Sequence, residues 1–356
     1  MRLRSIITTP HAIPLARPYA IASGTTAAVE LVVVRVEGDD GAAGLGAATP
    51  EPSVTGESFA ACRQALAEER TAALVGADLD CFAALAGRVG RDWRATPAAA
   101  AALDMALHDL RARSLGLPLV ALIGRAHETL PTSVTIGILP RAESVAEAEE
   151  RVGAGFRALK LKIGLDLDGD LERIAAVRER VGPDVALRVD GNCGYRPTEV
   201  PRLLFACSRH GVELVEQPCP PEADDELRAI PAARRRALVA DESCISPADA
   251  LRLAAGEPLY GGFVVKLMKC GGVTPALRIT AIAESAGIEL MWGCMDESAI
   301  GIAAALHAAY AAPATRWLDL DGSFELAHDP GRGGFRLRDG RLDLAAGPGL
   351  GVELAG

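Results

Sequence analysis

Aromatic residues, basic clusters and long apolar segments are all scarce in this sequence. Aromatics make up only 4% of the chain, which argues against the stacking platforms that bind single-stranded nucleic acid. The 37 basic residues are outnumbered by 47 acidic ones and form no block, so neither nucleic acid nor an anionic membrane is an expected partner. No apolar run has the length of a membrane span, and the N-terminal stretch has no apolar core long enough for a signal peptide. We therefore expect a cytoplasmic enzyme that acts on a small molecule.

The eight cysteines form no metal or redox motif. None belongs to a C-x-x-C pair or to a Cys/His cluster with zinc-finger spacing, so we expect reduced, mostly buried thiols. The chain has 356 residues, of which 49% are hydrophobic and 24% charged. This is the composition of a globular protein and the length of two domains or one large one.

The pattern along the chain changes near residue 130. Before it, a β-branched stretch at 29–36 is followed, from about 57 to 116, by an alanine-rich helical pattern, and together they predict an α+β domain. After it, short apolar strands alternate with amphipathic stretches, as a (β/α)8 barrel requires. The eight predicted strands are 132–138, 158–163, 185–190, 212–216, 238–241, 262–266, 288–292 and 317–321.

Charged residues end most of these predicted strands. They are Lys162, Asp190, Glu216, Asp241, Lys266 and Asp321, and the first five follow one another at intervals of 25 to 28 residues, about one β/α unit. A solvated surface would instead place charges on the helices between the strands. Because the carboxyl ends of barrel strands carry the active site, this recurrence predicts a catalytic constellation.

Three of the strand-end residues are acids on successive strands. Without a cation, the converging carboxylates of Asp190, Glu216 and Asp241 would repel one another. An all-oxygen ligand set with open positions for water suits Mg²⁺. The alternative is that these acids cap the helices that follow. One acid per strand in register favours the metal site.

The lysines supply candidate bases. Lys160 and Lys162 are two residues apart on one strand, so both side chains point to the same face, which in a barrel is the interior. Lysines near each other and near a cation have depressed pKa values, which makes one of them usable as a base. Lys266 lies four strands further on, across the barrel. Two opposed bases can remove a proton from one face of a carbon and return it to the other.

These residues resemble a known family. The lysine pair in 159–162, Asp-Gly-Asn at 190–192, Glu-Gln-Pro at 216–218, Asp-Glu-Ser at 241–243 and Lys266 look like the muconate-lactonizing subgroup of the enolase superfamily. The resemblance implies an α/β fold: an N-terminal α+β capping domain (1–125), a modified TIM barrel of the (β/α)7β type (126–325), and a C-terminal segment (326–356) that returns to the cap. It also implies one Mg²⁺ on the three acids and abstraction of a proton α to a carboxylate, with the enolate held by the metal.

The eighth strand resembles one branch of that subgroup. Asp319-Leu320-Asp321 looks like the D-x-D motif of dipeptide epimerases, whose acids hold the substrate's α-ammonium, although a strand end plus a turn acid is the alternative. The resemblance implies a dipeptide substrate that is epimerized at its C-terminal residue, with Thr135 and Ser23 as further binding positions, and a possible homo-oligomer. Lys162 and Lys266 would each serve one epimer, while Lys160 tunes Lys162 and helps to bind the substrate carboxylate.

Other activities remain open at this point. N-succinylamino acid racemases, o-succinylbenzoate synthases and muconate cycloisomerases handle substrates without a free ammonium for the D-x-D acids. An acid-sugar dehydratase normally carries a strand-end histidine where this chain has Lys266. A non-catalytic ligand-binding barrel would have no use for two opposed bases.

We expect two loops to contact the substrate's side chains. The stretch 19–25 has no basic residue to meet a glutamate side chain, as epimerases acting on Ala-Glu can have. The candidate pocket residues Glu51 and Asp296 are acidic instead, and would attract a cationic side chain and repel an anionic one, unless both are merely solvated loop residues. We therefore expect a preference for dipeptides with Lys or Arg side chains.

Overall fold

The N-terminal part is a three-stranded antiparallel sheet packed on helices. The structure is a computed structural model that describes residues 1–21 and 24–355. Strands β1 (Leu3–Ile21), β2 (Gly24–Gly38) and β3 (Ala43–Ala48) pair in sequence order. Six helices follow: α1 (Pro52–Thr55), α2 (Phe59–Ala65), α3 (Glu68–Thr71), α4 (Phe82–Asp92), α5 (Pro97–Ser114) and α6 (Leu119–Ile123). These elements confirm the predicted α+β unit.

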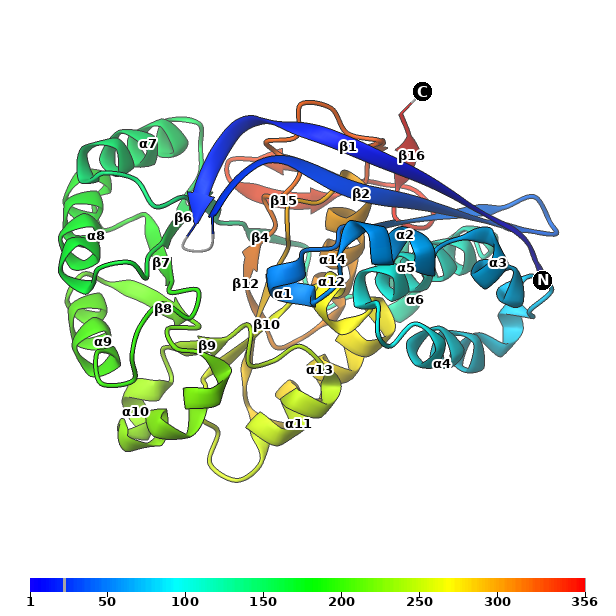
Figure 1. Cartoon of the computed structure of the whole chain (residues 1–356). Helices are drawn as coiled ribbons and strands as arrows, with labels where there is room; N and C mark the ends of the chain where they lie inside the picture. Colours follow the sequence, from blue (N-terminus) through cyan, green and yellow to red (C-terminus); the bar gives the residue numbers. More distant parts are fainter. Residues whose placement is uncertain (22–23, 356) are drawn as a thin grey trace.

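Small residues bring the sheet and helix α5 together. α5 is alanine-rich and buried almost all round. A Cβ at Gly44 would collide with the Ala106 carbonyl oxygen, and one at Gly46 with the Ala102 carbonyl oxygen, so β3 must present glycine to the helix. This close packing anchors the long β1–β2 hairpin, which extends from the cap across to the second unit (Figure 1).

The second unit is a parallel barrel with seven helical connections. Its strands follow one another in order: β5 (Val134–Ile136), β6 (Ala158–Lys162), β7 (Ala186–Asp190), β8 (Val212–Glu216), β9 (Leu238–Ala240), β10 (Gly262–Val265), β11 (Glu289–Gly293) and β12 (Thr315–Asp319). A parallel bridge from Thr132 to Leu318 brings the first and last strands together. The eight predicted strands are confirmed to within a few residues, and the last ends at Asp319 rather than Asp321.

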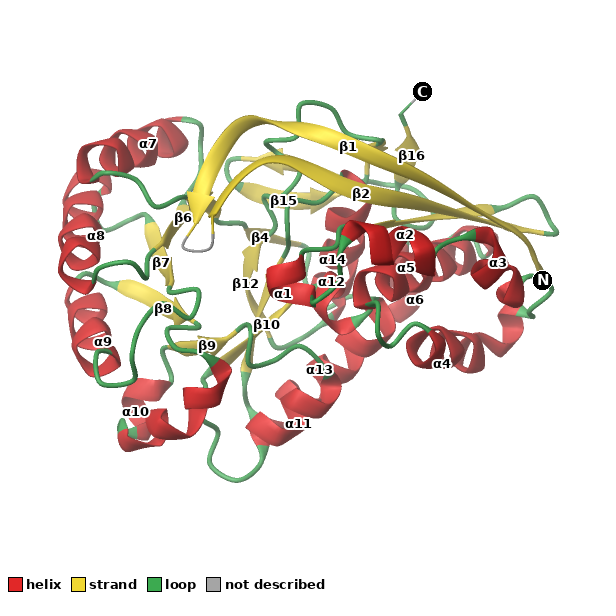
Figure 2. Cartoon of the chain, viewed as in Figure 1, coloured by secondary structure: helices red, strands yellow, loops and turns green. Residues whose placement is uncertain are grey.

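Helices cover the outside of the barrel (Figure 2). The connections hold α7 (Arg141–Gly153), α8 (Leu167–Val181), α9 (Val200–Arg209), a 3-10 segment (Pro221–Ala229) with α10 (Ala232–Arg235), α11 (Pro247–Ala254), α12 (Leu267–Cys270) with α13 (Val273–Ala286), and α14 (Ala299–Ala311). No helix precedes the C-terminal segment after β12, so the arrangement is the expected (β/α)7β. None of the helices in the described residues is long and apolar enough to cross a membrane.

The C-terminal segment contacts both units. It forms β13 (Gly331–Gly333), β14 (Phe335–Arg338), β15 (Arg341–Leu344) and β16 (Val352–Leu354), and β15 also pairs with β4 (Thr129–Pro131). Leu350 donates its backbone N–H to the buried carboxylate of Asp109 on α5, 2.7 Å away, which ties the segment to the cap. All eight cysteines are free thiols, and four of them are buried, fewer than the majority that we expected.

Candidate active site

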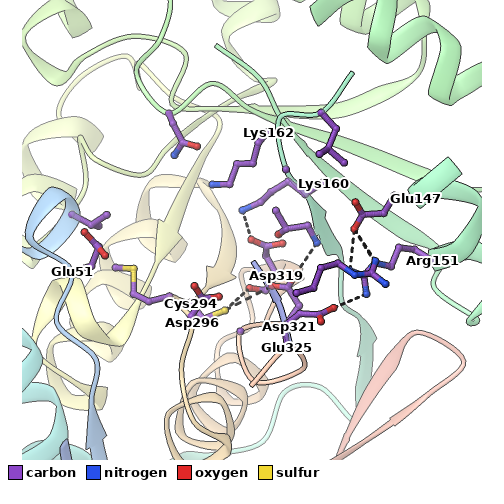
Figure 3. Close-up of a pocket in the computed structure, with 18 of the residues that line it drawn as sticks. Glu51, Glu147, Arg151, Lys160, Lys162, Cys294, Asp296, Asp319, Asp321 and Glu325 are labelled. Carbon is purple, nitrogen blue, oxygen red and sulfur yellow. Dashed lines mark hydrogen bonds and ion pairs between the residues drawn. The ribbon is translucent and has the colours of Figure 1, made fainter. Parts of the chain in front are cut away.

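The carboxyl ends of the barrel strands open into a cavity of about 770 Å³. Its walls combine barrel residues with Glu51 and Ser53 of the cap. The β1–β2 hairpin is held over it because Ala16 donates its N–H to the Glu325 carbonyl oxygen, 2.7 Å away, and Leu15 bridges Leu326. The site therefore lies at the carboxyl ends of the barrel strands, where the strand-end charges placed it, and the cap closes part of its wall (Figure 3).

The three predicted metal ligands lie together and are fully buried. Asp190 ends β7, Glu216 ends β8 and Asp241 directly follows β9, and none is more than 1% exposed. Burial and the neighbouring Asp190 raise the pKa of Glu216 well above its usual value. Bonded lysines outweigh the cost of burial at Asp190 and Asp241, whose pKa values are lowered. The arrangement is a concentration of negative charge around Glu216.

Two further residues fix Asp241. Gln217, held at a φ of +28°, accepts the Asp241 N–H on its side-chain oxygen at 2.9 Å. Lys269 is buried and bonds the Asp241 carboxylate as well as its backbone carbonyl oxygen. Lys269 thus forms a structural ion pair with Asp241.

The chemistry of this cluster fits a hard divalent cation. Oε1 of Glu216 is buried and has no hydrogen-bond partner among the described residues, and the donors are all carboxylate oxygens. Nowhere in the described residues do three His, Cys, Asp or Glu side chains stand in the arrangement of a formed metal site. Lys162 and Lys266 each bond an oxygen of one of these carboxylates.

Each of the three predicted lysines lies close to one of the three predicted metal ligands. Lys162 Nζ lies 2.7 Å from Asp190 Oδ2, and Lys266 Nζ lies 2.7 Å from Asp241 Oδ2. Lys160 lies 3.4 Å from Glu216 Oε2. Because β6 and β10 are four strands apart in the barrel, Lys162 and Lys266 approach the cluster from opposite sides.

The pKa values of two lysines differ from the expectation. Burial alone would lower the pKa of Lys160, but the carboxylates of Asp319 and Glu216 outweigh it and raise this pKa well above its ordinary value. Burial and Asp241 oppose each other in the same way at Lys266, where the net effect on the pKa is again upward. The expected depression requires a bound cation beside the lysines; here each ammonium is bonded directly to a carboxylate instead.

The two acids of the D-x-D motif have different surroundings. Asp319 is bonded to Lys160, and its Oδ1 accepts the Ser133 hydroxyl at 2.6 Å. Asp321 accepts the backbone N–H of Thr135 at 2.7 Å, and burial together with the charge of Asp319 raises its pKa to about 6. Both acids and Thr135 line the cavity. Asp321 has no lysine partner among the described residues.

The predicted specificity residues lie in the cavity wall. Glu51 lines it from the start of α1, where its carboxylate accepts the Ser53 hydroxyl at 2.8 Å. Asp296 lines it from the loop after β11. Ser23, predicted as a substrate contact, lies outside the described residues.

An ionic network in the cavity wall was not predicted from the sequence. Arg151 on α7 donates to Glu147 at 3.0 Å and to Glu325 at 2.9 Å, as Figure 3 shows. Arg17 of the hairpin donates to Glu150 on the same helix at 2.9 Å. The glutamates recur at helical spacing, so in the sequence they are typical of a solvated face. Overall, acidic side chains outnumber basic ones in the wall.

One sequence signal would have identified the lysines directly. The chain has only four lysines among its 37 basic residues, and they are Lys160, Lys162, Lys266 and Lys269. Every other basic residue is arginine. All four lysines therefore belong to this one site, where each is bonded to a carboxylate.

Comparisons with known proteins agree with this geometry. Residues 143–356 match the enolase C-terminal domain-like family, and residues 3–124 match the N-terminal domain of the mandelate racemase / muconate lactonizing enzyme family. The L-Lys-D/L-Arg epimerases of Methylococcus capsulatus and Desulforapulum autotrophicum are 51% and 45% identical to the chain, each over 99% of both sequences. The crystal structure of a dipeptide epimerase from Methylococcus capsulatus, complexed with Mg and L-Arg-D-Lys, matches with a TM-score of 0.97 and 51% identity over 99% of both chains. The chain therefore belongs to the mandelate racemase/muconate lactonizing enzyme family of the enolase superfamily.

Proposed function

We propose that this protein is an isomerase: a Mg²⁺-dependent dipeptide epimerase that inverts the α-carbon of the C-terminal residue and prefers cationic dipeptides. The observation that carries the proposal is the placement of Lys162 and Lys266 on opposite sides of one carboxylate cluster. The relatives named above act on such dipeptides according to their names. All eight cysteines are free thiols, which supports a cytoplasmic location.

The two lysines carry the proton transfer. One accepts the α-proton as a neutral amine, and the other, as an ammonium, donates a proton to the opposite face of the same carbon, so the charges of the pair exchange in each turnover. Lys160 is bonded to Asp319 and stays charged, so it helps to bind the substrate carboxylate. Asp190, Glu216 and Asp241 would hold the Mg²⁺, which supplies positive charge against the negative charge that develops on that carboxylate.

The substrate's N-terminal ammonium is assigned to the D-x-D acids, with Asp321 as the main contact. Asp319 is already bonded to Lys160 and Ser133, so it chiefly orients Lys160. We expect Asp321→Asn to raise KM for dipeptides by about 10- to 150-fold, the equivalent of losing a charge-assisted hydrogen bond of roughly 1.5–3 kcal/mol. Steady-state kinetics on free and N-acetylated dipeptides measure this contribution.

The pH profile checks the same carboxylate. Because the pKa of Asp321 is about 6, kcat/KM of the parent enzyme should fall as the pH is lowered through that value, when the carboxylate takes up a proton. Asp321→Asn should lack this inflection. If N-acetylated dipeptides turn over as well as free ones, the N-succinylamino acid racemase alternative is favoured.

The preference for cationic dipeptides can be tested by removing the negative charge of each acidic pocket residue. Glu51→Gln and Asp296→Asn should each lower kcat/KM for Lys- and Arg-containing dipeptides by about tenfold, and Ala-Leu should be affected less. Glu68→Gln, the same change at an exposed position of the cap helix α3, is the control. A competition among Ala-Glu, Ala-Leu, Ala-Lys and arginine dipeptides at low and high salt completes the test. A higher kcat/KM for Ala-Glu would contradict the cationic preference and leave the epimerase assignment standing.

The overall proposal is tested by solvent exchange. A dipeptide library incubated with the protein in D2O should gain one mass unit at the α-carbon of each substrate. N-succinylamino acids run in parallel distinguish the acylamino acid alternative. A ligand-binding barrel without catalysis would bind Mg²⁺ and dipeptides but exchange no α-hydrogen.

A further inference from the structure

A buried arginine holds the backbone at the base of Lys162. Arg173 on α8 is only 3% exposed, and its guanidinium donates to the carbonyl oxygens of Lys162 and, at 3.2 Å, Gly137. Lys162 is the last residue of β6, Gly137 directly follows β5, and both residues line the cavity. One side chain outside the barrel therefore joins two strand ends that shape the site.

Asp170 and Tyr195 keep that arginine in place. Asp170, one turn before Arg173 on α8, accepts from it at 2.9 Å. The other oxygen of the carboxylate accepts the Tyr195 hydroxyl at 2.7 Å and the Gly164 N–H at 2.9 Å. Asp170 and Tyr195 are at most 5% exposed. The cluster thus fixes the residues that follow Lys162.

The cluster also joins the loop after β6 to the loop after β7. Gly164 and Gly194 are packed backbone to backbone, and a Cβ on Gly194 would collide with the Gly164 carbonyl oxygen. Ile163 donates its N–H to the Asp190 carbonyl oxygen at 2.8 Å. Because both loops are held in this way, the backbone of Lys162 is fixed relative to that of Asp190, which is the partner of its ammonium.

Lys266 is held in a different way. Its carbonyl oxygen accepts the N–H groups of Lys269 and Cys270, at 3.1 and 3.2 Å, in the first turn of α12. No part of the Asp170–Arg173–Tyr195 cluster touches Lys266 among the hydrogen bonds of the described residues. The two bases thus have independent supports.

We infer that Asp170, Arg173 and Tyr195 are positioning residues that hold Lys162, and not Lys266, for proton transfer. The inference rests on the proposed function, in which each lysine serves one epimer. A displacement of about 1 Å in a reacting group can cost about a hundredfold in rate. Loosening the cluster should therefore slow exchange of one epimer of the substrate and largely spare the other.

The test measures α-hydrogen exchange of the L,L and L,D epimers separately in D2O. Lys162→Ala and Lys266→Ala identify the epimer that depends on Lys162. Arg173→Lys keeps the charge beside Asp170 but cannot reach both carbonyls, and we expect it to slow exchange of that epimer by about tenfold or more, with less than about a threefold change for the other. Tyr195→Phe removes one hydroxyl and should shift the ratio of the two rates in the same direction. The loss should appear in kcat rather than in KM.

Arg235→Lys is the matched control. Arg235 is also 3% exposed and donates to a backbone carbonyl, that of Ile230 at 2.6 Å, but it precedes β9 at the opposite end of the barrel. Arg235→Lys should leave the ratio of the exchange rates of the two epimers unchanged. Equal losses of exchange rate for both epimers would overturn the inference. An unchanged ratio of the two exchange rates in folded Arg173→Lys and Tyr195→Phe would also overturn it. If only Tyr195→Phe folds, the ratio measured in that variant decides. A parent protein that exchanges neither epimer would instead overturn the proposed function, and this assignment with it.

Discussion

Replacing any one of the three clustered carboxylates should abolish turnover. We expect Asp190→Asn, Glu216→Gln and Asp241→Asn each to lower kcat by about a thousandfold or more, because an α-proton beside a carboxylate that is already anionic is too weakly acidic without a cation. Excess chelator should abolish the parent's activity, and added Mg²⁺ should restore it. Full activity in excess chelator would contradict the metal assignment.

Stability measurements separate this effect from misfolding. Glu216 is buried, its pKa is raised, and one of its oxygens has no hydrogen-bond partner in the described residues. Glu216→Gln removes a charge that is costly in the metal-free protein, so its Tm without metal should not fall. Mg²⁺ should raise the Tm of the parent but not that of the variant, since only the parent binds it. Glu289→Gln, at the amino end of β11 and paired with Arg316 on the surface, should behave like the parent.

Much of the architecture was predictable because barrel strands repeat. Each β/α unit adds a short apolar strand whose last residue reaches the same edge, so equal spacing of Asp190, Glu216 and Asp241 in the sequence becomes proximity in space. The alternation of side chains along a strand likewise places Lys160 and Lys162 on one face. These arguments need only local periodicity.

The pairings inside the site were not predictable in that way. The contact of Lys160 with Asp319 joins residues 159 positions apart, and the contact of Arg17 with Glu150 joins residues 133 positions apart. Periodicity says which face a side chain shares, but not which neighbour it bonds. For this reason the sequence placed both D-x-D acids on one face but did not predict that Asp319 is bonded to Lys160. The raised pKa values of Lys160 and Lys266 were not predictable for the same reason, because they depend on which carboxylates these lysines contact.

The lysines themselves can be observed directly. With only four lysines in the chain, ¹⁵N-lysine labelling gives one Nζ signal for each of Lys160, Lys162, Lys266 and Lys269. In the metal-free protein the carboxylates hold the pKa values of Lys160 and Lys266 above their ordinary value, so these two signals should not titrate below pH 10. Addition of Mg²⁺ should lower both pKa values, because the cation competes for the same carboxylates.

Removal of one base should separate exchange from epimerization. Lys266→Ala should stop epimerization in both directions, because a proton removed by Lys162 can then return only to the face it left. Lys162 can still exchange the α-hydrogen of one epimer with solvent, and Lys162→Ala should show the opposite pattern with Lys266. Mass spectrometry in D2O measures the exchange of the α-hydrogen, and chiral separation of the products measures epimerization. We expect each variant to lose epimerization, and exchange of the epimer that its missing lysine serves, by more than about a thousandfold, near the upper range for general acid–base catalysis. Equal loss of exchange for both epimers in each single variant would refute the division of labour between two lysines that approach the carboxylates from opposite sides of the barrel.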